Sequence, residues 1–312
     1  MTRVGYPPAM QQFRRENHGA VELLRDQMRD WNSFTLFIGA GLSRPFGYRL
    51  WGEFLRNVAE SRPGLWLKVR PHMKSDLSKV AQVLEDQLGV TSFRRAVANE
   101  FKENGKLRSF TQSVYPALAV LPDLVNGPVI TTNLDHVLEH VFAAMNRPFS
   151  RVVWGERAQE IIKNPFMAGG NLIKFHGDYT DPAAWVLTTH QYNAMYGKPD
   201  ELESIMASDD ELKQWPLPHL LSLVTYARPL FFIGCSLRQD RTLDVLDRLA
   251  SNDRANPHVA LLERPSTAEE LDQRRHALDP HGILPIWYPL DQHGCVAGFL
   301  QYLRSQKPRH QR

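Results

Sequence analysis

Short apolar runs recur along the chain, and longer stretches with helical spacing separate them. The runs are continuously apolar rather than alternating, which is typical of strands covered on both faces. Strands separated by helices predict an α/β fold, a doubly wound, Rossmann-like parallel sheet. Residues 185–188 predict a short strand or a loop. The six main strands are predicted at residues 33–38, 128–132, 171–175, 229–233, 258–262 and 282–288.

Apolar positions with helical spacing fill the segment between the first two strands. Trp51, Phe54 and Leu55 are spaced for one helix face, and similar stripes continue as far as residue 121. We therefore expect a helical insertion or small helical domain over about residues 52–125. A further helical segment is predicted over about residues 190–226.

Composition and charge exclude several classes of protein. Lys and Arg total 37, and Asp and Glu total 34, so the formal net charge is only +3, which argues against a dedicated nucleic-acid binder. Two cysteines are too few for a disulfide scaffold or a four-ligand zinc module. The first residues lack an apolar signal core, and no run of about 18 apolar residues occurs. We expect a cytoplasmic protein that binds no metal, membrane or nucleic acid directly.

Small, polar or titratable residues follow the predicted strands. In a doubly wound sheet, ligands bind beyond the carboxyl ends of the strands. These positions are therefore the candidate site: Gly39-Ala40-Gly41, Asn133, His176, Gly234 and Glu263.

The first of these loops runs from Gly39 to Ser43. Glycine permits close approach of backbone amides to a phosphate, and the Ser43 hydroxyl adds a donor. The dinucleotide fingerprint of dehydrogenases fails here, because Arg44 replaces its third glycine and no acidic strand end follows within about 20 residues. A purely structural turn is the alternative interpretation.

An amide, a carboxylate and an imidazole follow the next two strands in the predicted sheet. Asn133 and Asp135 can bind ribose hydroxyls, water or a carboxamide, although both residue types also favour helix caps. His176 can exchange protons near neutral pH, although a lone loop histidine more often only forms hydrogen bonds. Their position at strand ends, together with the other motifs, favours a functional role.

The last two strand ends carry weaker signals. Gly234 and Ser236 again place a glycine and a hydroxyl after a strand, where a plain strand-to-helix connection is the alternative. Glu263 can accept two hydrogen bonds from a ribose diol, or remain a solvated carboxylate. Cys235 is interpreted as a packed residue, since nothing nearby marks it as a thiolate.

Taken together, these segments resemble the sirtuin fold, and most closely its bacterial branch of sirtuin-like NAD hydrolases. That branch also shows a Gly-x-x-x-Trp run, matched by residues 47–51, and a Leu-Thr…Tyr segment, matched by Leu187-Thr188 and Tyr192. The matching motifs span about residues 34–263. In chain order they are Gly39-Ala40-Gly41-Leu42-Ser43, Thr131-Thr132-Asn133-Leu134-Asp135, His176-Gly177 and Gly234-Cys235-Ser236-Leu237.

The resemblance implies a role for each matching position. Asn133 would hold the nicotinamide ribose or an attacking water, and His176 would be the general base. Asp135 would bind the carboxamide of NAD. Gly39, Ala40, Gly41 and Ser43 would line the diphosphate, and Gly234, Ser236 and Glu263 would hold the adenosine side.

Departures from the deacylase branch point away from acyl-lysine substrates. Deacylases normally carry a four-cysteine zinc module, which Cys235 and Cys295 cannot build. Thr132 stands where deacylases usually have glutamine, and residues 46–51 differ from their usual segment.

We therefore expect residues 1–312 to form one sirtuin-like catalytic domain that hydrolyses NAD to nicotinamide and ADP-ribose. The resemblance implies an anti-phage effector that depletes NAD. Members of that family often carry a fused sensor, and the catalytic domain is expected to take up the whole of this chain. We therefore expect sensing in trans, through a partner such as a short Argonaute or a HerA-type ATPase, or gating by homo-oligomerisation. The alternatives are an NAD-dependent deacylase and a catalytically silent NAD-sensing subunit; a dehydrogenase is disfavoured.

Overall fold

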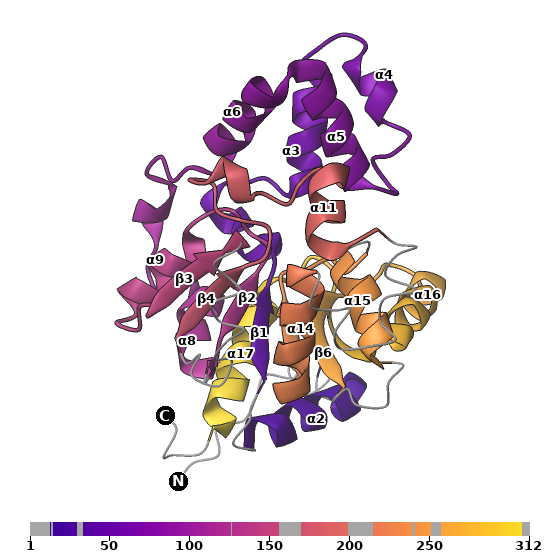
Figure 1. The fold of residues 1–312 in the computed structure, drawn as a ribbon. Helices are drawn as coiled ribbons and strands as arrows, with labels where there is room; N and C mark the ends of the chain where they lie inside the picture. The colour runs from indigo at the N-terminus through magenta and orange to yellow at the C-terminus, as the bar shows by residue number, and fades with distance from the viewer. Residues whose placement is uncertain are drawn as a thin grey trace.

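Seven strands form one sheet in the computed structural model of the chain (Figure 1). The structure describes residues 13, 15–29, 34–125, 127–155, 170–198, 215–238, 241–250 and 257–307. The strands are β1 (Thr35–Ile38), β2 (Val129–Thr131), β3 (Arg151–Trp154), β4 (Asn171–Lys174), β5 (Leu230–Ile233), β6 (His258–Glu263) and β7 (Ile283–Tyr288).

All neighbouring strands pair in parallel, in the order β3-β4-β2-β1-β5-β6-β7. The predicted doubly wound, Rossmann-like parallel sheet is therefore confirmed. The chain winds outward from β1 in one direction through β2, and later returns to the other side of β1 with β5. The reversal lies between β1 and β5, and ligands of such sheets bind beyond the carboxyl ends of the strands at this point.

Each face of the sheet is buried under its own hydrophobic core. In β1, Leu36 and Ile38 belong to one core and Phe37 to the other, because successive side chains of a strand point to opposite faces. All four residues of β1 and of β5 are buried, which explains why their runs are continuously apolar.

Helices supply the other half of each core. The first core takes apolar side chains from α2 (His18–Arg29), α9 (Val137–Ala144) and α17 (Gly294–Gln306). The second takes them from α11 (Thr189–Tyr196), α14 (Pro216–Ala227), α15 (Arg241–Ala250) and α16 (Ala268–Leu278). None of the helices in the described ranges is long and apolar enough to cross a membrane.

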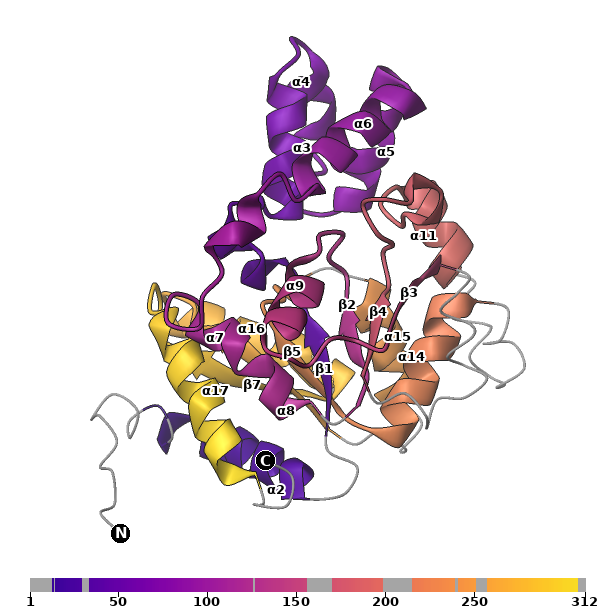
Figure 2. The same cartoon turned by 90° about the vertical axis from the view of Figure 1, so that its left-hand side faces the viewer.

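The segment between β1 and β2 is helical. Its four larger helices stand beyond the carboxyl ends of the strands, whereas α2 lies at the opposite end of the sheet (Figures 1 and 2). Contacts between Ser78 and Thr189 (3.3 Å) and between Gln82 and His190 (3.2 Å) join α5 to α11. The helices are α3 (Trp51–Glu60), α4 (Leu65–Val69), α5 (Leu77–Leu88), α6 (Val90–Phe101), α7 (Pro116–Ala119) and α8 (Leu121–Leu124).

One detail differs from the sequence-based expectation. Strand β3 was not predicted, because Arg151 is exposed and only Val153 of its four residues is buried, so the segment lacks a continuous apolar run. Residues 185–188, expected as a strand or a loop, form a buried loop. The helical segment expected over 190–226 contains α11 and α14, and its residues 199–214 lie outside the described residues.

Candidate functional site

The loops that follow β1 and β5 contact each other backbone to backbone. The amides of Gly39 and Gly41 donate to the carbonyls of Ile233 and Gly234, both at 2.9 Å. A Cβ at Gly39 would lie 2.5 Å from the Gly234 carbonyl oxygen, and Gly234 itself has a φ of +71°. Only glycine fits this approach and this backbone conformation. The two predicted glycine loops therefore meet where the sheet reverses, with no side chain between their closest atoms.

Asn133 is fixed against the first of these loops. Its side-chain amide donates to the Ser43 hydroxyl at 3.1 Å, and its backbone amide donates to the Thr131 hydroxyl at 3.0 Å. The side chain is only 6% exposed, and its Oδ1 is buried with no hydrogen-bond partner among the described residues. A buried acceptor without a donor is costly, and such an atom in a native protein points to a missing partner.

Asp135 serves as a helix cap and is also part of the buried site. Its Oδ1 accepts from the Val137 amide at 3.0 Å, at the start of α9. Burial raises the pKa of Asp135, while the Val137 amide, the charge of Lys174 and a hydrogen bond with Ser43 act in the opposite direction. Capping and a functional role, posed as alternatives by the sequence, are therefore compatible at this position.

His176 follows β4 and is held by tyrosines of α11. Its Nε2 lies 3.2 Å from the Tyr196 hydroxyl, which in turn lies 3.3 Å from the Thr242 hydroxyl. The Tyr192 ring meets the imidazole edge-on, at 5.2 Å between centroids. The imidazole is 6% exposed, so its orientation is fixed by packing as well as by hydrogen bonding.

The Leu-Thr…Tyr motif explains why α11 lies there. The Thr188 hydroxyl accepts from the Gln191 amide, and the Gln191 side chain accepts from the Thr188 amide at 3.0 Å, which is a capping box. This cap begins a helix on which Tyr192 and Tyr196, four residues apart, share one face. Arg241 stabilises the C-terminal end of α11 by donating a hydrogen bond to the Gly197 carbonyl at 2.7 Å.

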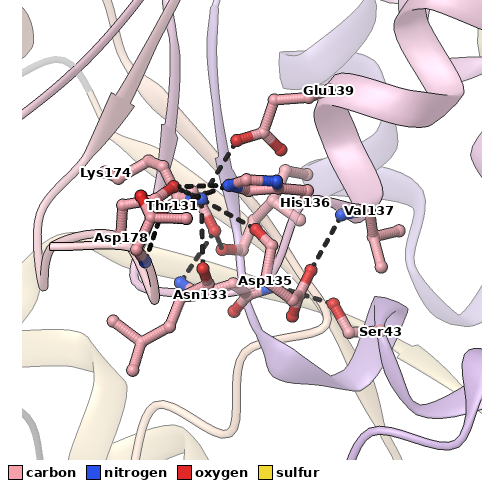
Figure 3. Close-up of polar contacts among 12 residues, drawn as sticks. Ser43, Thr131, Asn133, Asp135, His136, Val137, Glu139, Lys174 and Asp178 are labelled. Atoms are coloured by element: carbon pink, nitrogen blue, oxygen red, sulfur yellow. Dashed lines mark hydrogen bonds and ion pairs between the residues drawn. The ribbon is translucent and has the colours of Figure 1, made fainter. Parts of the chain in front are cut away.

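A buried lysine connects the loop of Asn133 to the loop of His176 (Figure 3). Lys174, at the end of β4, is completely buried. Its ammonium group donates to the backbone carbonyls of Leu134 (3.2 Å) and Asp135 (2.8 Å). It also donates to the carboxylates of Glu139 (3.0 Å) and Asp178 (2.6 Å). The lysine therefore fixes the segment after β2 relative to the segment after β4.

The charges in this cluster stabilise one another. Burial alone would lower the pKa of Lys174, but Glu139 and Asp178 outweigh it and raise that pKa. Burial would likewise raise the pKa of Asp178, but hydrogen bonds from His136 and Lys174 hold it well below its usual range. Lys174 and Asp178 thus form a charged pair in the interior.

The cluster around Lys174 also contains an imidazole and two carboxylates, which are side chains that commonly bind metal ions. The ligand atoms of His136, Glu139 and Asp178 all lie within 4.8 Å of one another. The Lys174 ammonium is bonded to both carboxylates, so these anions already have a cation between them.

The remaining predicted positions lie at the same edge of the sheet but make other contacts. Thr132 is half-buried directly after β2, and Ser236 is exposed after β5, with its carbonyl accepting from Arg274. Glu263 ends β6, where its Oε1 accepts from the Asp291 amide at 2.9 Å. No contact among the described residues joins Glu263 to Asn133.

Sequence reasoning missed Lys174 and Tyr196. A lysine inside an otherwise apolar strand was a usable signal, because a buried ammonium requires anions and acceptors around it. The partnership between Tyr196 and His176 had no comparable signal, since it depends on how α11 packs on the sheet.

Comparison with protein families gives one match. Residues 128–286, just over half of the chain, match the SIR2-like domain. The chain belongs to the SIR2-like family. The matched span contains Asn133, His176 and Gly234, and the hydrogen bond from Asn133 to Ser43 connects it to the glycine loop that precedes it. No curated protein matches the chain significantly.

Membership of the SIR2-like family implies NAD as the ligand, and two features of the structure fit that ligand. The buried Oδ1 of Asn133 needs a donor, which a ribose hydroxyl or a water supplies. The loops of Gly39 and Gly234 pack backbone to backbone at the reversal of the sheet, where a dinucleotide phosphate binds in such folds.

Proposed function

We propose that this SIR2-like protein hydrolyses NAD at the bond between nicotinamide and ribose. The observation that carries the proposal is the buried amide of Asn133. Its nitrogen is bonded to Ser43, and its oxygen has no hydrogen-bond partner among the described residues. In the loop after the neighbouring strand β4, His176 is held in a fixed orientation by Tyr196. Asn133, a hydrogen-bond acceptor after β2, and His176, a base after β4, are suited to positioning a water molecule and deprotonating it for attack on a sugar carbon.

The reaction breaks one bond and forms another. The N-glycosidic bond breaks, and its electron pair leaves with nicotinamide, so positive charge develops on the ribose. A water oxygen then bonds to the same carbon and loses its proton. We assign the positioning of ribose or water to Asn133 and the removal of the proton, directly or through a ribose hydroxyl, to His176.

The other positions would bind the substrate. Gly39, Ala40, Gly41 and Ser43 would line the diphosphate, and Thr132 would border the ribose. Asp135 would bind the carboxamide. Gly234, Ser236 and Glu263 would hold the adenosine side. Within this proposal the whole chain acts as one catalytic domain.

Hydrolysis is favoured over deacylation by the cysteine count. Both cysteines, Cys235 and Cys295, are free, and two thiols cannot form the four-cysteine zinc module that accompanies peptide substrates in deacylases. Hydrolysis of NAD requires only NAD and water.

The test is incubation of the purified chain with NAD and separation of the products by chromatography. We expect nicotinamide and ADP-ribose in equal amounts, and no release by the Asn133→Ala variant. Turnover of an acyl-lysine peptide would show a deacylase instead. Tight NAD binding without release of nicotinamide, even when candidate activators are present, would show a silent sensing subunit, and either result would overturn the proposal. Cyclic ADP-ribose would be resolved in the same run.

We further propose that activity is gated by assembly, consistent with a defence effector that depletes NAD on demand. The gate would be self-association or a sensor protein in trans, such as a short Argonaute or a HerA-type ATPase. The measurement is size-exclusion chromatography with NAD turnover assayed in each fraction. Full and permanent activity in a lone monomer would contradict this part of the proposal.

A further inference from the structure

The first turn of α11 is completed by a residue of the helical insertion between β1 and β2 (Figure 1). The first four backbone amides of a helix have no partner within that helix. In α11, the Gln191 amide donates to the Thr188 hydroxyl, whereas the His190 amide donates to the side-chain oxygen of Gln82 in α5, at 3.2 Å. The start of α11 therefore depends on a residue 108 positions earlier in the chain.

Ser78 of α5 makes a second contact with the same turn. Its hydroxyl oxygen lies 3.3 Å from the Thr189 hydroxyl and 2.7 Å from a carboxylate oxygen of Asp76. An ionised carboxylate only accepts, so Ser78 donates its single proton to Asp76, and Thr189 donates to Ser78. Asp76 is also the N-cap of α5, where it accepts from the Lys79 amide at 3.0 Å. The Ser78 hydroxyl is therefore oriented as an acceptor for α11.

Gln82 is likewise oriented by its own helix. Its side-chain nitrogen donates to Asp86 at 3.0 Å, which leaves its oxygen for the His190 amide. Ser78 and Gln82 are four residues apart and so share one face of α5. This face presents two acceptors to the two donors in the first turn of α11.

Helix α11 also carries the tyrosines that hold His176. The Tyr196 hydroxyl lies 3.2 Å from the imidazole Nε2, and the Tyr192 ring meets the imidazole edge-on at 5.2 Å between centroids. Thr189, which contacts Ser78, lies one turn before Tyr192. Because α11 has only eight residues, a change in the position of its first turn also moves both tyrosines.

We propose that Ser78 and Gln82 are positioning residues for the reaction at His176, so that the helical insertion forms part of the framework of the active site. This inference rests on the proposed NAD hydrolysis and deepens it, because it names the contact through which the insertion acts on the general base. The two side chains hold α11, and α11 holds the imidazole through Tyr196. Displacement of α5 by a bound partner would act on His176 through the same contacts.

The first test is steady-state hydrolysis of NAD by the double variant Ser78→Ala/Gln82→Ala. We expect kcat to fall about tenfold, a factor equivalent to one lost hydrogen bond, with KM unchanged. The pH dependence of kcat should shift, because the hydrogen bond between Tyr196 and the imidazole is disturbed. A wild-type kcat and pH profile in this double variant would overturn the inference.

Two further variants show whether the loss comes from the contact with α11. Gln82→Glu should keep a kcat close to that of the wild type, because its carboxylate still accepts from the His190 amide. Ser61→Ala/Gln87→Ala is the matched control, since it changes the same residue types in the same insertion, at side chains that bond Val58 and Lys68. A loss in the control as large as that in Ser78→Ala/Gln82→Ala would reject the inference.

A background without the imidazole tests the route. If Ser78 and Gln82 act through His176, their substitution should leave the residual rate of His176→Ala unchanged, because the group that they position is gone. A further tenfold loss in the combined variant would show that α5 acts elsewhere, and would reject the inference.

Nuclear magnetic resonance separates this inference from the proposed function, because it requires no turnover. The readouts are the imidazole signals of His176, assigned by comparison with His176→Ala, and the hydrogen-exchange rates of the α11 amides. Ser78→Ala/Gln82→Ala should shift the signals and speed the exchange, whereas the control should do neither. Unchanged signals and rates would reject the role of Ser78 and Gln82 and leave NAD hydrolysis standing. If the signals shifted but the unaltered protein released no nicotinamide, the proposed function would fail, and the positioning of His176 by α5 would still stand.

Discussion

The side-chain amide of Asn133 donates a 3.1 Å hydrogen bond to the hydroxyl of Ser43, across 90 residues of chain. This bond connects the carboxyl end of β2 to the glycine loop after β1, and β1 also pairs with β5 on its other side. Three loops distant in sequence are thereby held together at the reversal of the sheet.

Replacing Gly39 with alanine should disrupt the contact between the two glycine loops. The added Cβ would lie 2.5 Å from the Gly234 carbonyl oxygen, so the backbone must shift, at a cost of about 1–3 kcal/mol. Gly19→Ala in α2 is the control, since nothing lies within 4 Å of its Cβ position. Urea unfolding should show destabilisation for the first variant and a neutral or small stabilising effect for the second. Equal stability of the two variants would contradict the close approach of Gly39 to the Gly234 carbonyl.

Lys174→Met should be among the most destabilising single changes. The substitution leaves the carboxylates of Asp178 and Glu139 without their ammonium partner, and it leaves two backbone carbonyls without the hydrogen bond that Lys174 donates. Breaking a buried ion pair costs about 3–5 kcal/mol of stability. Lys79→Met, at an exposed lysine of α5, should stay within about 0.5 kcal/mol of the wild type. Chemical denaturation measures both. A loss for Lys174→Met no larger than that of the control would contradict the network.

The Asp178 pair should make stability sensitive to acid. Because the folded-state pKa of Asp178 is held well below its usual range, the pair contributes its stabilisation above the ordinary carboxyl pKa of about 3.9 and loses it as the pH falls further. The free energy of unfolding should therefore drop more steeply on acidification in the wild type than in Asp178→Asn. Parallel pH profiles for the two proteins would refute the charged pair.

Tyr196→Phe should slow catalysis without impairing substrate binding. The hydroxyl bonds the His176 imidazole and makes no contact assigned to NAD, so Tyr196 is a positioning residue. We expect kcat to fall about tenfold with KM unchanged, and the pH dependence of kcat to shift, because a hydrogen bond to the imidazole is lost. Tyr226→Phe, at a tyrosine that is 72% exposed, is the control. An unaltered pH profile in Tyr196→Phe would remove Tyr196 from the mechanism.

Most of the sheet was predictable from the sequence, and the reason is physical. Strands buried on both faces, such as β1 and β5, must be continuously apolar, so their runs stand out. Strand β3 is the edge strand next to β4 in the described part of the sheet, and it exposes Arg151. It therefore need not be continuously apolar, and its residues form no such run.

The candidate site was predictable in position but not in its supporting contacts. Asn133 and His176 became candidates because they follow strands whose carboxyl ends share one edge. The partners that orient them come from elsewhere: Ser43 from the first loop, and Tyr196 from a helix whose packing the sequence does not specify. Only the structure shows that the buried hydroxyl of Tyr48 has no hydrogen-bond partner among the described residues.

The central claim is that Asn133 and His176 act on one molecule of NAD. The most direct test is the rate of nicotinamide release from NAD by the wild type, Asn133→Ala, His176→Ala and the double variant, each confirmed to be folded. We predict that each single change lowers the rate by at least about 100-fold, and that the double variant is no slower than the slower single one, because the two residues work as a unit. Release of nicotinamide at the wild-type rate by either single variant would contradict the claim.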